Sequence, residues 1–190
     1  MAPGLEQCMY CGEDEGTDID HFEPLARNPL RTFDWLNHLL ACSTCNSHNK
    51  RNQFPLDADD QPLLIDPTAE DPFDHLLLTL SLGHYEPLTT KGKATIEVCE
   101  LNRPLLERGR VRSRRVVNYC VRAWASAHRE SNAKAMAEAV TTVQEQPFAD
   151  VCQAMLRQAQ SPGAEIVFSD SPEILALLRD PELRDALLSR

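Results

Sequence analysis

The chain has 190 residues, of which 42% are hydrophobic, and its mean hydropathy is −0.38. This composition is typical of a folded globular protein and excludes a chain that is disordered throughout. Apolar runs fall well short of the roughly 20 residues that span a bilayer. Residues 1–6 lack the charged and then apolar pattern of a secretory leader. We therefore expect a cytoplasmic protein without membrane contact.

The net charge of −10 is unevenly distributed along the chain. Residues 103–129 hold eight arginines and one acid, a local charge of +7, which leaves −17 for the rest of the chain. Exposed charges are screened over about 10 Å at ordinary salt, so a basic helix face can bind phosphate on an acidic protein. The charge therefore does not exclude a nucleic-acid partner.

Four of the seven cysteines form two Cys-x-x-Cys pairs, Cys8 with Cys11 and Cys42 with Cys45. Two such pairs suit one tetrahedral zinc ion, and a site closed by four thiolates leaves no open position for water. We therefore expect a structural Zn²⁺ that staples a segment with little core of its own. Taken alone, the cysteines favour a plain zinc ribbon without chemistry, because closed four-cysteine sites are usually structural. Three further cysteines are expected to be small buried hydrophobes: Cys99, Cys120 and Cys152.

The first third of the chain predicts the order strand, strand, helix. Residues 18–23 alternate weakly between apolar and polar, which indicates a short strand that Pro24 ends. Residues 34–41 supply the next strand or turn, and residues 45–51 begin a helix. Residues 54–72 hold four prolines among five aspartates, which is typical of a loop.

The remainder predicts helices at residues 90–101, 104–129, 133–145 and 148–160. Asn102 and Pro104 are expected as the cap and first residue of the long helix, and Ser171 and Asp180 as caps of two short ones. Two faces are expected on the long helix. The apolar face comprises Val116, Cys120, Ala123, Trp124 and Ala127, and the opposite face comprises Arg108, Arg112, Arg115, Arg122 and Arg129.

Residues between the cysteine pairs have the chemistry that phosphodiester hydrolysis requires. Hydrolysis needs a base that activates water and a cation that stabilises charge on the phosphate. His21 could be the base, because imidazole titrates near neutral pH. Asp20 and Asn46 carry oxygen donors of the kind that Mg²⁺ prefers. Because Asp20 and His21 are adjacent, a regular strand would point them to opposite faces, unless the backbone bends there.

This pattern resembles the HNH (His-Me finger, ββα-metal) endonucleases with a four-cysteine zinc. The family pattern is Asp-His on the first strand, Asn before the second, and a Cys-x-x-Cys-Asn ending. The resemblance implies that His21 is the general base and that Asn37 fixes the loop that orients it. It also implies that Asp20 and Asn46 hold a catalytic divalent cation, Mg²⁺ with Mn²⁺ as the alternative.

One departure from the family pattern concerns the end of the motif. The family carries a lysine three residues after the asparagine, whereas here Asn49 takes that position and Lys50 follows it. The register could therefore be shifted, and His48 could replace Asn46 as the second ligand of the catalytic cation.

Short motifs further along resemble the HNH nuclease subunits of Septu and retron-type anti-phage systems, which work beside an ATPase. They lie at residues 64–67, 71–76, 94–96 and 101–105. Asp-Pro turns and an Asn-Arg-Pro helix start also account for these motifs without a partner. The resemblance implies an antiviral role and an ATPase partner.

Taken together, the sequence predicts an α+β protein. It divides into a zinc-stapled ββα-metal motif at residues 1–56, an Asp/Pro-rich connector at 57–89 and a helical domain at 90–190. The expected activity is cleavage of nucleic acid, with DNA favoured over RNA. The alternatives are an RNase of the same fold, acting on a tRNA-type substrate, and a non-catalytic zinc module that mediates protein interaction.

Overall fold

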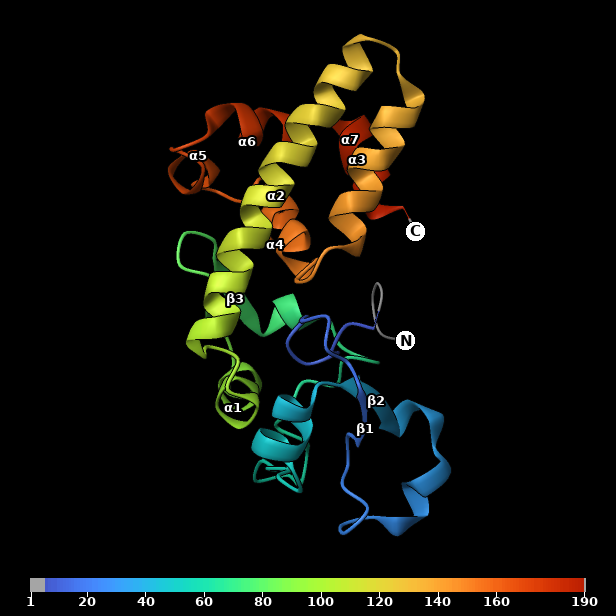
Figure 1. The fold of residues 1–190 in the computed structure, drawn as a ribbon. Coiled ribbons are helices and arrows are strands. Elements are labelled where there is room, and N and C mark those ends of the chain that lie inside the picture. The colour runs from blue at the N-terminus through green and yellow to red at the C-terminus, as the bar shows by residue number, and fades with distance from the viewer. Residues whose placement is uncertain (1–5, 190) are drawn as a thin grey trace. The chain divides into compact units, whose positions relative to one another are not determined.

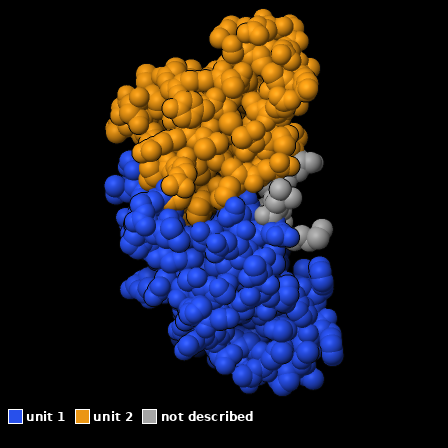
Figure 2. Space-filling model, in the orientation of Figure 1, with its two compact units in different colours: residues 1–108 blue, residues 109–190 orange. Residues whose placement is uncertain are grey.

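The computed structural model of the chain describes residues 6–189. The expectation about a leader therefore concerns residues that lie almost entirely outside the described part. Contacts group the chain into two compact units, Met1–Arg108 and Gly109–Arg190 (Figure 2). The division into separate domains at residues 56 and 89 stays a prediction.

The predicted order strand, strand, helix is confirmed in the first unit. Strand β1 (Asp18–His21) pairs antiparallel with β2 (His38–Ala41), and the helical turn η3 (Thr44–Lys50) follows directly (Figure 1). The register sets Asp20 opposite Leu39 and His21 opposite His38. The long loop between the strands contains two 3-10 turns, η1 (Pro29–Phe33) and η2 (Trp35–Asn37).

The segment expected as a connector contains regular structure. After the turn η4 (Pro72–Asp74), strands β3 (Leu76–Thr79) and β4 (His84–Pro87) form a second antiparallel hairpin. The sequence there is a continuous apolar run, which does not display the alternation of a strand. The structure buries Leu76 and Leu78 and leaves Leu77 43% exposed. Successive side chains therefore alternate between buried and exposed positions, although all three residues are leucine.

The remaining elements are helices: α1 (Thr90–Cys99), α2 (Pro104–Arg129), α3 (Ala133–Glu145), α4 (Asp150–Gln158), α5 (Ala164–Val167), α6 (Pro172–Leu178) and α7 (Pro181–Leu188). The predicted helices are confirmed, and α5 is an addition. No helix within residues 6–189 is both long enough and apolar enough to cross a membrane.

Helix starts follow the predicted proline positions, but their capping differs. Asp180 accepts a hydrogen bond from Leu183 N at 3.0 Å and caps α7 as expected. Ser171 occupies the N-cap position of α6 as predicted, but its hydroxyl bonds Asp170 Oδ1 at 2.9 Å and makes no capping hydrogen bond. Asn102 directs its amide to β4, where Oδ1 accepts from Tyr85 N at 2.8 Å and Nδ2 donates to Tyr85 O at 2.9 Å.

The arginines of α2 divide into buried and exposed residues. The predicted arginine face is confirmed, because Arg108, Arg112, Arg115, Arg122 and Arg129 are all exposed. Arg110 and Arg114 are buried instead; the first lies 6.0 Å from the Phe148 ring centroid, and the second bonds Asp170 at 2.9 Å. The apolar face is confirmed in part, because Trp124 and Ala127 are buried as predicted. Ala123 is exposed instead, and Val117 and Val121 are buried in addition.

Candidate active site and metal centre

The four paired cysteines converge in one buried cluster. The sulfur atoms of Cys8, Cys11, Cys42 and Cys45 all lie within 4.8 Å of one another, and Cys11 Sγ is 3.9 Å from Cys42 Sγ. A tetrahedral zinc with Zn–S bonds of about 2.3 Å separates its sulfurs by about 3.8 Å. The cluster therefore has the size and donor set of a structural zinc site.

Backbone contacts position both cysteine pairs. Cys45 N donates to Cys42 Sγ at 3.4 Å, which orients a lone pair of that thiolate. Gly12 follows the first pair with a φ of 79°, a conformation that glycine adopts without strain, and its N–H bonds Cys8 O at 2.9 Å. Met9 N bonds Leu40 O at 2.8 Å and ties the first pair to β2.

Asp20 lies on the buried face of β1. It is 5% exposed, and its Oδ2 lies 2.9 Å from the ammonium of Lys50, which is fully buried. The Tyr10 hydroxyl donates to the same carboxylate. Burial and the Asp20 charge raise the pKa of Tyr10 well above its ordinary value, so the phenol stays a donor. Removing either member of this ion pair would leave the other charge buried and uncompensated.

Lys50 is a site residue whose place depends on the unusual geometry of η3. This turn has π-type hydrogen bonding, with Arg51 N bonding Asn46 O five residues earlier at 2.8 Å. A π turn holds one more residue than an α turn. The lysine stands four residues after Asn46, one more than in the family pattern, and the extra residue of the π turn compensates for this shift. Lys50 therefore still reaches β1, where it also bonds His21 O at 2.9 Å.

His21 lies on the opposite, accessible face of β1, as a regular strand requires. Its ring is 4.7 Å from that of its cross-strand neighbour His38. His38 Nδ1 lies 2.8 Å from the Asp34 carbonyl, so this nitrogen carries the proton and the bond holds the ring. The register of β1 with β2 runs through Asp20 and His21 without a break, so the backbone stays regular there and the two side chains point to opposite faces.

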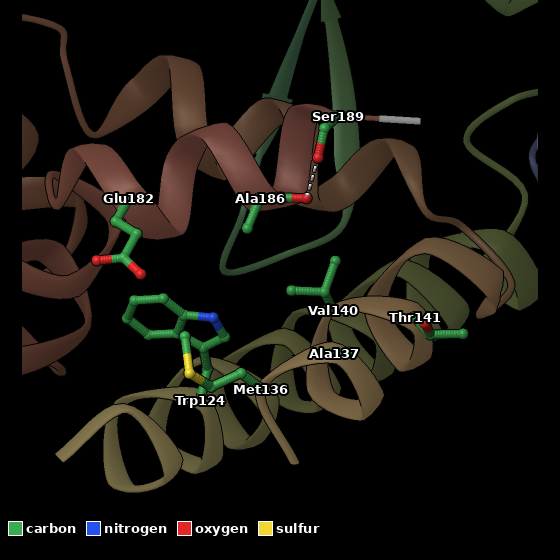
Figure 3. Close-up of a pocket in the computed structure, with 8 residues that line it drawn as sticks. All are labelled: Trp124, Met136, Ala137, Val140, Thr141, Glu182, Ala186 and Ser189. Atoms are coloured by element: carbon green, nitrogen blue, oxygen red, sulfur yellow. Dashed lines mark hydrogen bonds between the residues drawn. The ribbon is translucent and has the colours of Figure 1, made fainter. Parts of the chain in front are cut away.

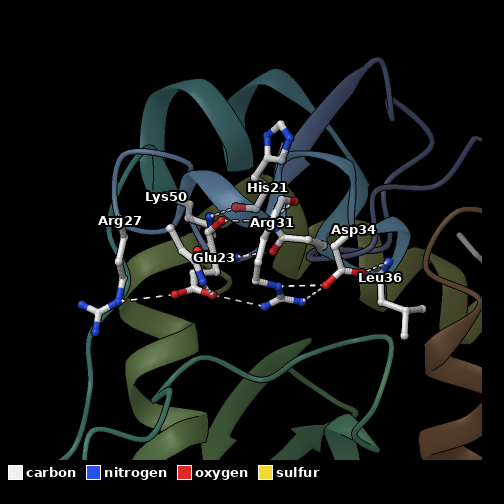
Figure 4. A network of polar contacts seen from close by, with 9 residues as sticks. His21, Glu23, Arg27, Arg31, Asp34, Leu36 and Lys50 are labelled. Atoms are coloured by element: carbon white, nitrogen blue, oxygen red, sulfur yellow. Dashed lines mark hydrogen bonds and ion pairs between the residues drawn. The ribbon is translucent and has the colours of Figure 1, made fainter.

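Asn37 is fully buried and holds the loop that leaves His21. Its Oδ1 accepts from Glu23 N at 2.8 Å, and its Nδ2 donates to Glu23 O at 3.1 Å. The Glu23 carboxylate in turn bridges Arg27 at 3.6 Å and Arg31 at 3.3 Å (Figure 4). The contacts of Asn37 therefore fix the backbone directly beyond the histidine.

The two alternative ligands of η3 differ in their surroundings. Asn46 Nδ2 donates to Asp18 Oδ2 at 3.2 Å, and Ser47 Oγ is 3.3 Å from the same oxygen. His48 is exposed and lies 3.1 Å from the Ser43 carbonyl. Asp18 was not singled out from the sequence, although its spacing of two from Asp20 places both on one face of a strand.

The loop between β1 and β2 exposes large apolar side chains. Phe33 is 93% exposed and Trp35 71%, and both belong to the loop that joins the ends of β1 and β2 at His21 and His38. Exposed apolar clusters of this kind mark interaction sites.

A pocket in the second unit has a different character (Figure 3). It is lined by Trp124, Met136, Ala137, Val140, Thr141, Glu182, Ala186 and Ser189. Glu182 is the one ionisable side chain of that lining, so the pocket offers neither a nucleophile paired with a base nor a metal-binding set.

Comparison with known proteins identifies the class of the domain at residues 8–52. Residues 8–52 match the HNH endonuclease family model, so the chain carries an HNH domain around its cysteine cluster. The chain is also 28% identical to the Septu protein PtuB of Bacillus mycoides (strain KBAB4). That match covers 51% of this chain and 43% of the relative, which is less than half of the relative's length. No solved structure matches the chain. The predicted resemblances to HNH nucleases and to Septu proteins are confirmed.

Proposed function

We propose that the protein is a divalent-cation-dependent HNH endonuclease that hydrolyses phosphodiester bonds in DNA and acts in anti-phage defence. The observation that carries the proposal is His21, an accessible imidazole at the end of a hairpin within an HNH domain stapled by four cysteines. Incubating the protein in parallel with supercoiled plasmid and total RNA, over a titration of Mg²⁺ and Mn²⁺, tests activity and substrate together.

His21 is the general base in this proposal and takes a proton from the attacking water. Its backbone is held from two sides. Lys50 donates to its carbonyl at 2.9 Å, and Asn37 binds the next residues of the loop. These contacts support a role for both residues in positioning the imidazole, because a base must stay within hydrogen-bond reach of the water.

Asp20 and Asn46 are the proposed donors for the catalytic cation, which when bound supplies charge stabilisation at the scissile phosphate. Carboxylate and amide oxygens fit Mg²⁺ or Mn²⁺. Asp20 is held by Lys50, so binding a cation requires it to share or exchange that contact. Asp18 lies beside Asn46 and is the second carboxylate that could take this place.

The ligand assignment predicts a difference among variants of these residues. Asn46→Ala and Asp20→Ala should each raise the Mg²⁺ concentration needed for half-maximal cleavage by about ten-fold or more, because each removes one oxygen donor. Asp20→Ala should also lower the thermal stability, because it leaves the Lys50 ammonium buried without its partner. Asn46→Ala should lose far more activity than His48→Ala. Metal titrations of plasmid nicking measure both effects. An inactive His48→Ala beside an active Asn46→Ala would establish the shifted register instead. Asp18→Asn, tested beside Asp20→Asn, identifies which carboxylate the cation needs.

The nature of the substrate is supported by two surfaces. Phe33 and Trp35 offer exposed aromatic faces on which bases can stack. On α2, Arg112, Arg115 and Arg122 share an exposed face with Tyr119, which is 71% exposed. Guanidinium groups contact phosphates through paired donors, and this contact depends little on sequence. We accordingly expect cleavage without strong sequence preference.

The arginine face predicts a change in salt dependence. Replacing Arg112, Arg115 and Arg122 by alanine should weaken DNA binding and flatten its salt slope by about one unit per lost phosphate contact, with the fold unchanged. Arg122 is also bonded to Glu173, so its share of the effect should be the smallest. Lys134→Ala, which removes another exposed cation of the second unit, is the control. Unchanged binding together with loss of a copurifying protein would make the face a protein interface.

An ATPase subunit is the partner that we expect in the cell, on the similarity to a Septu protein. Co-expression of the chain with an ATPase subunit of a Septu-type system, followed by size-exclusion chromatography, tests this expectation. Elution of the chain and the ATPase in two separate peaks, with both proteins at micromolar concentration, would contradict it.

A further inference from the structure

Arg103, in the turn between α1 and α2, places its guanidinium on the cysteine cluster. Its Nη1 and Nη2 each lie 3.7 Å from Cys45 Sγ, and Nη2 is also 3.8 Å from Cys11 Sγ and 4.0 Å from Cys42 Sγ. The side chain is only 14% exposed. No pattern in the sequence links this arginine to cysteines that lie more than fifty residues earlier.

The turn that carries Arg103 is anchored on both sides. Asn102 binds the backbone of Tyr85 on β4 through both ends of its amide. Asn49 of η3 donates to Cys99 O at 3.2 Å, and the same carbonyl accepts from Arg103 Nη1 at 3.2 Å. The guanidinium is therefore held from its own backbone as well as from the thiolates, so it reaches the sulfurs at low entropic cost.

Charge explains why a cation belongs there. Four thiolates around Zn²⁺ carry a net charge of −2, and this cluster is buried. A buried charge is costly unless it is paired and hydrogen-bonded. Glu13 lies 4.0 Å from Arg103 and adds a further negative charge. Arg103 is therefore positioned to balance the negative charge of the cluster and of Glu13.

We propose that Arg103 is a positioning residue of the zinc site, which holds the thiolates through charged N–H···S bonds and slows loss of the metal. The zinc centre then includes the turn between α1 and α2 and is not complete within residues 8–52. This inference depends on zinc at the cysteine cluster and is independent of the proposed nuclease activity.

The test measures transfer of Zn²⁺ from the full-length protein to a chromogenic chelator. Arg103→Met keeps the packed stem and removes the charge, and Arg103→Lys keeps a point charge without the planar fork. Arg108→Met, an exposed arginine of the following helix α2, is the control. We expect Arg103→Met to release zinc about 10-fold to 100-fold faster than wild type. The release rate of Arg103→Lys should lie between those of wild type and Arg103→Met, and that of Arg108→Met should match wild type.

Equal release rates for wild type, Arg103→Met and Arg108→Met would overturn the proposal. If Arg103→Met does not fold while Arg103→Lys does, the need for a cation over the thiolates is supported directly. Zinc release does not depend on cleavage, so an inactive protein with fast release from Arg103→Met would reject the nuclease and retain the role of Arg103.

Discussion

Replacing His21 by alanine should abolish measurable plasmid cleavage, with a loss of about 10²–10⁴-fold in rate, because a positioned general base contributes that much to hydrolysis. The side chain lies on the accessible face of β1, away from the buried pair of Asp20 and Lys50. The fold should therefore survive the substitution. Single-turnover cleavage at saturating Mg²⁺ measures the chemical step separately from binding.

Two controls make the result specific to the imidazole of His21. His128→Ala removes an exposed histidine of the second unit and should leave the cleavage rate unchanged. Zinc content and far-ultraviolet circular dichroism of His21→Ala should equal those of wild type. Cleavage by His21→Ala at the wild-type rate would exclude this residue as the base. In that case His38, whose ring lies 4.7 Å away, becomes the imidazole to test.

Local signals in the sequence predicted most of the fold, because those elements depend on neighbouring residues. Pro104 and Pro181 each occupy the first turn of a helix that begins where the proline allows. The β3–β4 hairpin was missed because strand pairing, and not residue type, decides which leucines of residues 76–80 are buried. Ser171 starts α6 at the predicted position but without a capping bond, because Asp170 takes its hydroxyl.

The sequence predicted which residues belong to the candidate site, but not which of their side chains contact one another. The adjacency of Asp20 and His21 suggested a shared site, and the structure separates them onto two faces of one strand. What decides the environment of Asp20 is Lys50, and the lysine reaches it because η3 is a π turn. Hydrogen-bonding type within a single helical turn leaves no clear mark in the sequence, so this contact could not be inferred beforehand.

A zinc ion held by the four cysteines would account for the stability of the first unit around the β1–β2 hairpin. The buried apolar cluster there consists of Phe22, Leu39 and Leu64, with a few partly buried neighbours packed against it. Burying such side chains contributes about 1.5–3 kcal/mol each, and the entropy of ordering the long loop between β1 and β2 offsets much of that. Zinc binding to four thiolates contributes about 10–16 kcal/mol in small zinc domains. The metal therefore outweighs the apolar core locally.

Replacing Cys42 by serine should consequently unfold the segment around the β1–β2 hairpin and reduce the zinc content from about one ion per chain to a small fraction of that. Cys42 is buried, its Sγ lies 3.9 Å from Cys11 Sγ, and it accepts from Cys45 N, so its thiolate belongs to the four-cysteine cluster. Elemental analysis, thermal unfolding and limited proteolysis measure the loss. Cys120→Ser, a half-buried cysteine of α2, should keep both zinc and the melting temperature. Wild-type thermal stability of Cys42→Ser would count against a shared four-cysteine site, because a closed site cannot lose one thiolate without losing most of its binding free energy.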